Sequence, residues 1–95
     1  MPSAFDPTKT TPTKIEIYTS MTCGYCMRAL HLLNSKNVTY DQIDVTLNAD
    51  LRAKMRSRAG GSSSVPQVFI NDDHIGGCDE LYALERAGKL DMLLS

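Results

Sequence analysis

The stretch KIEIYTSMTCGYCMRALHLL, residues 14–33, changes its hydrophobic period at its centre. Residues 14–18 alternate between polar and apolar side chains and contain two isoleucines, a pattern that predicts a β-strand. After Cys23 the apolar side chains recur at the i, i+3, i+4, i+7 spacing of a helix that packs one face on a core. This stripe consists of Cys26, Ala29, Leu30 and Leu33. The stretch therefore predicts a strand, a short polar loop and a helix that begins at a Cys-x-x-Cys pair.

The remaining chain continues this alternation of strands and helices. Runs rich in β-branched residues predict strands, and apolar stripes at helical spacing predict helices. The strands are expected at residues 38–45, 65–70 and 74–75. The helices are expected from Asn48 or Asp50 up to a flexible connection at residues 59–64, from Asp79 as N-cap to Gly88, and over residues 89–94. The predicted order is β-α-β-α-β-β-α, so the fold class is α/β.

Size and charge narrow the functional classes. The chain has 95 residues, and we expect one domain at residues 14–95 after a disordered arm at residues 1–13, which holds three prolines. The net charge of -1 indicates no basic surface for nucleic acid, and no apolar run reaches the ~18–20 residues of a membrane span. Three cysteines and the absence of a secretory signal pattern favour a reducing compartment, the cytoplasm.

The Cys-x-x-Cys pair by itself allows three chemistries: a metal site, a structural disulfide and reversible thiol–disulfide exchange. Structural zinc needs four ligands, and neither His31 nor His74 has a partner at ligand spacing, so both are expected to be surface residues. A structural disulfide between Cys23 and Cys26 would close a very small loop and add little stability. Thiol exchange is therefore the favoured chemistry.

Helix phasing gives the two thiols different roles in that chemistry. Cys23 is expected at the first turn of the helix, where free backbone N–H groups and the helix dipole favour the thiolate, which is the species that attacks a disulfide. Cys26 lies one turn later on the core-facing stripe, where it can resolve a mixed disulfide formed at Cys23. Cys23 is therefore the candidate nucleophile and Cys26 the candidate resolving cysteine.

Two further motifs are compatible with a site for a peptide-like ligand. SVPQ, residues 64–67, places Pro66 at the start of a strand, and a cis bond between Val65 and Pro66 would present the Val65 backbone to an extended ligand. GGCD, residues 76–79, leads into a helix whose first N–H groups can hold an anion. A trans proline and an ordinary helix cap are the alternatives for these two motifs.

TCGYC, SVPQVFI and HIGGCDELYAL together resemble the glutaredoxins, in particular the small bacterial dithiol members, over about residues 15–94. The resemblance implies a thioredoxin-like fold, with a four-stranded mixed sheet flanked by helices. It also implies glutathione-dependent reduction of protein disulfides and of glutathione mixed disulfides. The expected partners are glutathione and disulfide-containing or glutathionylated proteins, the expected form is a monomer, and no nucleic acid or membrane is expected to take part.

The same resemblance implies a role for each site residue. Tyr25 would flank bound glutathione, and Val65, before cis Pro66, would pair with the cysteinyl backbone of glutathione. The γ-glutamyl end of glutathione would be held by Gly77, Cys78, Asp79 and Glu80.

At two places the chain departs from the family pattern around the glycyl carboxylate of glutathione. Ser20 stands where a lysine is common, and GGSSS at residues 60–64 replaces a basic or polar residue. The glycyl carboxylate is then left to Arg58, to serine hydroxyls such as that of Ser64, or to no strong partner. Arg58 itself is expected on the solvent face of the second helix.

Two more departures concern Glu80, where aspartate is typical, and Gly24, where proline is frequent. Members with a small residue at the position of Gly24 can resemble the glutaredoxins that share a [2Fe–2S] cluster between two subunits. The alternative function is therefore a cluster-bridged dimer that acts as a cluster carrier or sensor, with Cys23 as the metal ligand and glutathione completing the set.

Overall fold

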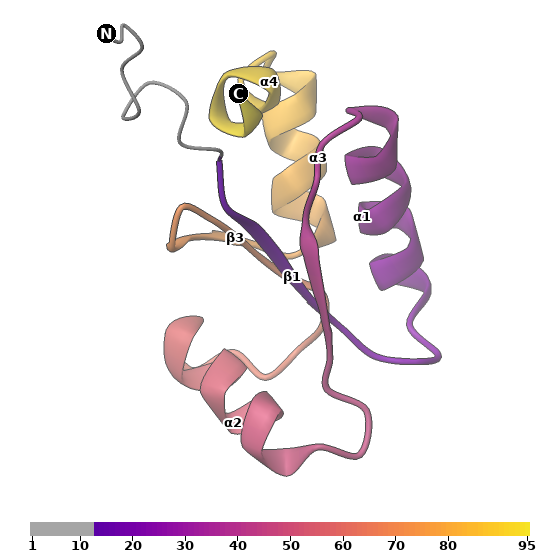
Figure 1. The fold of residues 1–95 in the computed structure, drawn as a ribbon, viewed down its shortest axis with the longest axis vertical. Helices are drawn as coiled ribbons and strands as arrows, with labels where there is room; N and C mark the ends of the chain where they lie inside the picture. Colours follow the sequence, from indigo (N-terminus) through magenta and orange to yellow (C-terminus); the bar gives the residue numbers. More distant parts are fainter. Residues whose placement is uncertain (1–12) are drawn as a thin grey trace, which may run out of the picture.

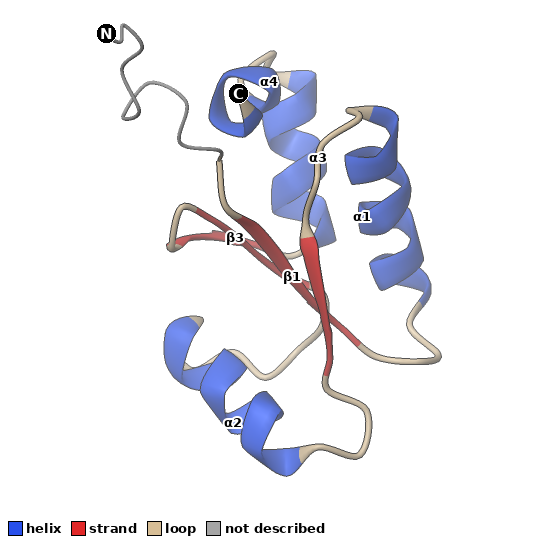
Figure 2. Cartoon of the chain, viewed as in Figure 1, coloured by secondary structure: helices blue, strands red, loops and turns tan. Residues whose placement is uncertain are grey.

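The structure is a computed structural model, and it describes residues 13–95. The predicted arm at residues 1–13 lies outside the described residues, apart from Thr13. A four-stranded sheet lies between helices on both of its faces (Figure 2). The elements are β1 (Ile15–Thr19), α1 (Gly24–Ser35), β2 (Asp41–Asp44), α2 (Ala49–Arg58), β3 (Gln67–Ile70), β4 (Asp73–Gly76), α3 (Cys78–Arg86) and α4 (Leu90–Leu94).

The sheet is mixed, with the strand order β2-β1-β3-β4. β1 runs parallel to β2 and antiparallel to β3, and β3 is antiparallel to β4. α1, α3 and α4 cover one face of the sheet, whereas α2 covers the other (Figure 1). This is the thioredoxin-like arrangement that the resemblance implied, and it brings the end of β1, the start of α1 and the start of α3 to one end of the molecule.

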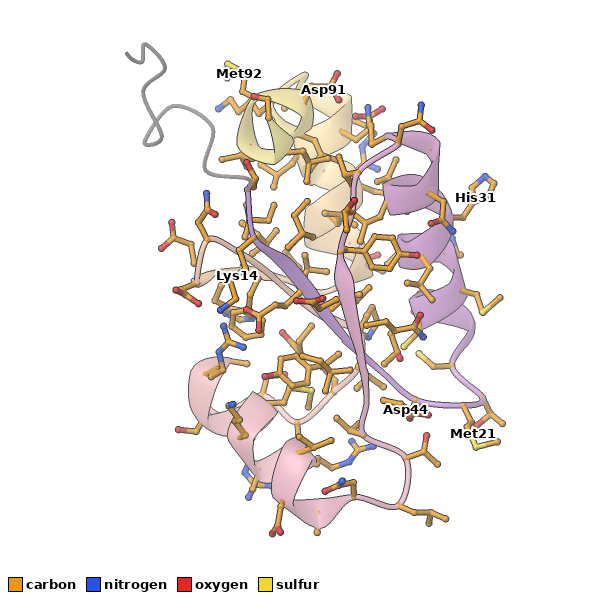
Figure 3. The ribbon with its side chains drawn as sticks, viewed as in Figure 1. Lys14, Met21, His31, Asp44, Asp91 and Met92 are labelled. Carbon is orange, nitrogen blue, oxygen red and sulfur yellow. The ribbon has the colours of Figure 1, made fainter. Side chains whose placement is uncertain are left out.

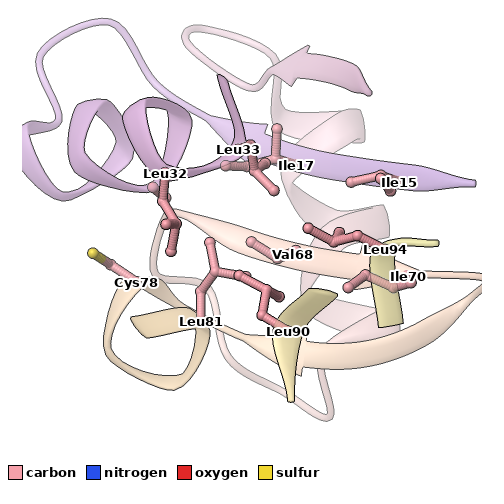
Figure 4. Close-up of a cluster of buried hydrophobic side chains, with 11 residues drawn as sticks. Ile15, Ile17, Leu32, Leu33, Val68, Ile70, Cys78, Leu81, Leu90 and Leu94 are labelled. Atoms are coloured by element: carbon pink, nitrogen blue, oxygen red, sulfur yellow. The ribbon is translucent and has the colours of Figure 1, made fainter. Parts of the chain in front are cut away.

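Two apolar clusters hold these layers together. Because successive side chains of a strand point to opposite faces, the isoleucines of β1 meet α1 and α3, while Tyr18 points toward α2. Figure 4 shows the larger cluster, in which residues of β1 and β3 pack against Leu33, Leu81 and Leu90. The smaller cluster contains Tyr18, Val45, Met55, Ala59 and Phe69.

The face of the sheet under α2 also buries a charged pair. Glu16 on β1 is 9% exposed, and its carboxylate accepts a hydrogen bond from Arg58 Nη2 at 2.9 Å. Arg58 Nη1 donates to Tyr18 Oη at 2.9 Å, and the guanidinium lies 4.1 Å from the centroid of the Phe69 ring. The prediction that Arg58 faces solvent is therefore wrong, because a carboxylate buried under a helix needs a charged partner.

Three predicted boundaries differ from the structure. The strand predicted at residues 38–45 pairs only over Asp41–Asp44, and β3 begins at Gln67, directly after the cis bond between Val65 and Pro66. Asp79 was predicted as the N-cap of α3, but Gly77 occupies that position. The Glu80 carboxylate accepts a hydrogen bond from the Gly77 N–H at 2.7 Å. This backbone donor, which was expected to bind a ligand, is therefore already satisfied within the protein.

Candidate active site

Cys23 occupies the N-cap position of α1, as helix phasing predicted. The backbone N–H of Cys26 donates to Cys23 Sγ at 3.1 Å, and the other first-turn N–H groups of the helix lie at the same end. Such donors and the helix dipole stabilise negative charge on a sulfur at this place. In its thiol form Cys23 also donates to the carbonyl oxygen of Val65, with Sγ and O 3.6 Å apart.

Cys26 lies on the buried side of the same helical turn and is 1% exposed. Burial and the hydrogen bond with the neighbouring Cys23 sulfur raise the pKa of the Cys26 thiol to about 12. Cys23 is partly exposed, and both residues are free thiols in the structure. The two sulfurs thus differ in access, and the buried Cys26 is held as a neutral thiol, which suits a resolving thiol that acts after an exposed nucleophile.

One pocket lies next to Cys23, because Val65, whose carbonyl oxygen contacts Cys23 Sγ, belongs to its lining. Its walls come from three segments that are distant in the chain. These segments are the start of α1, the loop before β3 and the start of α3. The pocket is lined by Tyr25, Ser64, Val65, Pro66, Gly77, Cys78, Asp79 and Glu80. All eight residues singled out from the sequence as ligand-binding candidates therefore meet around one cavity.

The glycines before α3 allow two walls of this pocket to approach each other. Gly76 has a φ of +121°, and a Cβ there would lie 2.8 Å from the side chain of Glu80. A Cβ on Gly77 would lie 3.3 Å from the carbonyl oxygen of Pro66. Gly76 requires glycine because of its positive φ and the close contact with Glu80, whereas a Cβ on Gly77 would need only a small shift of the Pro66 backbone.

Cys78 forms part of the pocket wall and, at 5% exposure, also belongs to the larger apolar cluster. Figure 4 places it at one end of that cluster. Burial raises the pKa of the Cys78 thiol, while the positive charge of Arg28 acts in the opposite direction. The Cys78 sulfur is therefore held as a neutral thiol, and Cys23 is the better nucleophile of the two.

Two residues discussed for the glycyl end of the ligand do not line this pocket. Arg58 is engaged with Glu16 under α2. Ser20 belongs to the loop before Cys23, whose Met21 projects outward at this end of the molecule near Asp44 (Figure 3). Sequence reasoning missed Gln67; the signal was a polar residue within the apolar run VPQVFI, where it is only 4% exposed.

His31 is exposed and points away from the body of the protein (Figure 3), and His74 is exposed as well. Within residues 13–95, no group of three or more His, Cys, Asp or Glu side chains is arranged to hold a metal ion. In that same part of the chain no helix has the length and apolar character needed to cross a membrane.

A Cys-x-x-Cys pair at the start of α1, beside a cis proline on this sheet, defines a thiol–disulfide oxidoreductase of the thioredoxin-like fold. The family model described as Glutaredoxin matches residues 15–75. A probable glutaredoxin of Synechocystis sp. is 54% identical over 81 residues, which are 85% of this chain and 92% of the relative. Glutaredoxin 3 of Escherichia coli (strain K12) is 51% identical over 80 residues, 84% of this chain and 95% of the relative. The chain belongs to the glutaredoxin family.

Solved structures agree with this assignment. A glutaredoxin from Brucella melitensis has a TM-score of 0.75 at 48% identity, and the match covers 85% of this chain and 87% of the other. A buckwheat glutaredoxin in complex with glutathione has a TM-score of 0.78 at 32% identity, covering 86% of this chain and 76% of the other.

Proposed function

We propose that this protein uses glutathione to reduce glutathione mixed disulfides and protein disulfides, with Cys23 as the nucleophile. The observation that carries the proposal is the pocket beside Cys23, whose eight lining residues include an exposed aromatic ring, a backbone segment before a cis proline and a helix N-terminus. The buckwheat relative solved with glutathione supports this choice of ligand.

Each part of the pocket suits one part of glutathione. The ring of Tyr25 would flank the tripeptide, and the peptide of Val65 would pair with its cysteinyl backbone as a short added strand. The N–H groups of Cys78 and Asp79 have no partner inside α3, so they would receive the γ-glutamyl carboxylate. The Gly77 N–H already donates to Glu80 and would contribute less than we expected from the sequence.

The first reaction step would take place at the Cys23 sulfur. Its thiolate attacks the glutathione sulfur of a mixed disulfide, a bond forms between the two sulfurs, and the substrate thiolate leaves and takes up a proton. Loss of the Cys23 proton also frees the Val65 carbonyl oxygen from its contact with Sγ. A second glutathione thiolate then attacks the sulfur of the bound glutathione, which releases glutathione disulfide and restores the Cys23 thiolate.

A protein disulfide would need the second cysteine. Once Cys23 is joined to a substrate sulfur it carries no negative charge, so one cause of the raised Cys26 pKa disappears. Cys26 can then lose its proton and attack Cys23 Sγ, which releases the reduced substrate and leaves a disulfide between Cys23 and Cys26. Two glutathione molecules supply the electrons that reduce this disulfide.

The test is glutathione-coupled reduction of two substrates, a glutathionylated peptide and a protein disulfide. We expect Cys23→Ser to abolish both activities, and Cys26→Ser to keep deglutathionylation while losing reduction of the protein disulfide. Retention of either activity by Cys23→Ser would contradict the proposal. Because the chemistry requires reduced thiols, we also propose that the protein acts in the cytoplasm. The proposed reaction uses the two cysteines of one chain, so we propose a monomer as the acting form.

A second candidate function is the [2Fe–2S] cluster-bridged dimer. A Cβ placed on Gly24 would meet nothing within 4 Å, so the approach to Cys23 is open on that side. Cys26 is buried as a neutral thiol, so each chain would hold the cluster through Cys23 alone, with glutathione sulfur as the remaining ligand. Anaerobic incubation with iron, sulfide and glutathione tests this function: a dimer with visible absorbance supports it, and a colourless monomer contradicts it.

A further inference from the structure

Gln67 connects the loop before the cis proline to β4 through four polar contacts. Its amide nitrogen Nε2 lies 3.0 Å from the carbonyl oxygen of Ser64, 3.2 Å from Ser64 Oγ and 3.1 Å from Ser62 Oγ. Its oxygen Oε1 lies 2.6 Å from His74 Nε2. The Gln67 side chain is buried between these groups, whereas His74 is exposed on its other side and stacks near the Phe69 ring.

The chemistry of these partners determines where the hydrogens lie. The carbonyl oxygen of Ser64 can only accept, so the amide nitrogen of Gln67 must face it. The amide oxygen then faces His74, and because that oxygen can only accept, His74 Nε2 must carry a hydrogen. The buried amide is thus held in one orientation from both ends.

The hydroxyl groups of Ser62 and Ser64 carry two hydrogens, and only one of them has an acceptor within the described residues. Ser62 Oγ and Ser64 Oγ lie 3.1 Å apart, so one hydroxyl hydrogen is used between them. Both oxygens also lie within hydrogen-bonding distance of the Gln67 amide nitrogen. One of its two hydrogens is used by the Ser64 carbonyl oxygen, so the two hydroxyl oxygens share the other. The second hydroxyl hydrogen has no acceptor among residues 13–95, and Ser64 lines the pocket. When Ser62 donates to Ser64, the free hydrogen belongs to Ser64 and can point into the pocket.

We propose that Gln67 is a positioning residue that sets this end of the pocket for an anionic ligand group. Because its second amide hydrogen points at the serine hydroxyl oxygens, the hydroxyl hydrogens cannot point toward Gln67, and that of Ser64 is free to turn outward, toward a carboxylate of the bound peptide. By holding the Ser64 carbonyl it also places the neighbouring Val65 peptide. His74 does not contact the serines itself; it donates to the Gln67 oxygen and so holds the Gln67 amide in place. The inference rests on the proposed function, because it assumes that glutathione occupies the pocket.

The experiment compares the full-length wild-type protein with Gln67→Met, which keeps the side-chain volume and removes both hydrogen-bonding ends. The probe is S-methylglutathione, which cannot react, and its Kd is measured by calorimetry. One or two lost positioning hydrogen bonds predict a Kd about five- to tenfold higher in Gln67→Met. With a glutathionylated peptide, KM should rise by a similar factor while kcat changes much less, because the hydrogen bonds of the Gln67 side chain go to Ser62, Ser64 and His74 and to neither cysteine of the site.

Two further variants make the result specific. Gln42→Met is the matched control, since Gln42 lies on β2, on the other side of β1, and its amide donates only to Thr19 Oγ1; its Kd should equal that of wild type. His74→Phe keeps a ring beside Phe69 and removes only the outer donor, so the Kd should rise about two- to threefold. Because His74 is exposed, this variant is informative even where Gln67→Met fails to fold.

A ¹⁵N spectrum of the His74 ring provides a readout independent of activity. We expect a hydrogen on Nε2 in wild type and a loss of that preference in Gln67→Met. An unchanged Kd in folded Gln67→Met, or a fall in kcat at constant KM, would overturn the inference and leave the proposed function intact. A wild-type protein that does not bind S-methylglutathione would overturn both.

Discussion

At the scale of single residues, Cys23 and Cys26 show how three positions along a helix separate two identical side chains. The N-cap position exposes one sulfur to solvent and to backbone donors, and the following turn buries the other. Burial favours the neutral thiol, and so does a neighbouring sulfur that carries negative charge. The different environments of the two thiols thus follow from their positions on the helix.

The raised pKa of Cys26 predicts a loss of stability at alkaline pH. A thiol with an ordinary pKa near 9 in the unfolded chain and about 12 in the folded protein binds its proton more tightly when folded. Its contribution to stability is therefore complete below pH ~9 and is lost as the pH rises toward 12. Urea unfolding under reducing conditions should show a shallower decline from pH 8.5 to 10.5 in Cys26→Ala than in wild type.

Val68→Ala is the control for this measurement, because it also removes buried atoms and introduces no titrating group. Its stability should decline with pH in parallel with wild type. Parallel profiles for Cys26→Ala and wild type would show that Cys26 titrates alike in the folded and unfolded states.

At the scale of elements, α2 stands out because little of its surface is apolar. Met55 is its buried residue, and Arg58 at its last turn reaches across to Glu16 and Tyr18 on β1. A helix with so narrow an apolar stripe gains much of its tertiary stabilisation from such side-chain anchors. Arg58 therefore holds the end of α2 on the sheet.

Arg58→Met should lower the free energy of unfolding by about 1–3 kcal/mol, since it leaves the Glu16 carboxylate buried without its charged partner. Arg56→Met, an exposed arginine on the same helix, should change it by less than about 0.5 kcal/mol. Chemical denaturation measures both. In Glu16→Gln/Arg58→Met the combined loss should be smaller than the sum of the two single losses, and additive losses would mean that the pair contributes nothing.

At the scale of the whole molecule, both apolar clusters contain residues of β1 and β3. Detachment of the helices from either face of the sheet would therefore expose apolar side chains of the same two strands. Small domains of this kind unfold in one cooperative transition. α4 takes part as well, because Leu90 is fully buried in the larger cluster.

Leu90→Ala and Met55→Ala lie in different clusters, and each should lower the free energy of unfolding by about 2–5 kcal/mol. In both variants far-ultraviolet circular dichroism and tyrosine fluorescence should report the same single transition. Leu47→Ala, at a fully exposed leucine, should match wild type. Two separate transitions in either core variant would show that the layers unfold independently.

Local patterns in the chain were enough to predict the alternation of strands and helices and the unequal positions of Cys23 and Cys26 on their helix. These features are readable because hydrophobic period, helix caps and short motifs are local properties of the chain. The resemblance to a family then implied the four-stranded mixed sheet and the full set of candidate ligand-binding residues, which pattern alone leaves open.

The pairing of the polar groups could be seen only once the chain was folded. Arg58 meets Glu16 across 42 positions, and Glu80 takes the Gly77 N–H that we expected to bind a ligand. Gln67 was a polar residue in an apolar run until folding brought His74 and the serines to its two ends. A buried polar group must find a partner wherever the packed elements supply one, and that choice depends on three-dimensional contacts that no local pattern encodes.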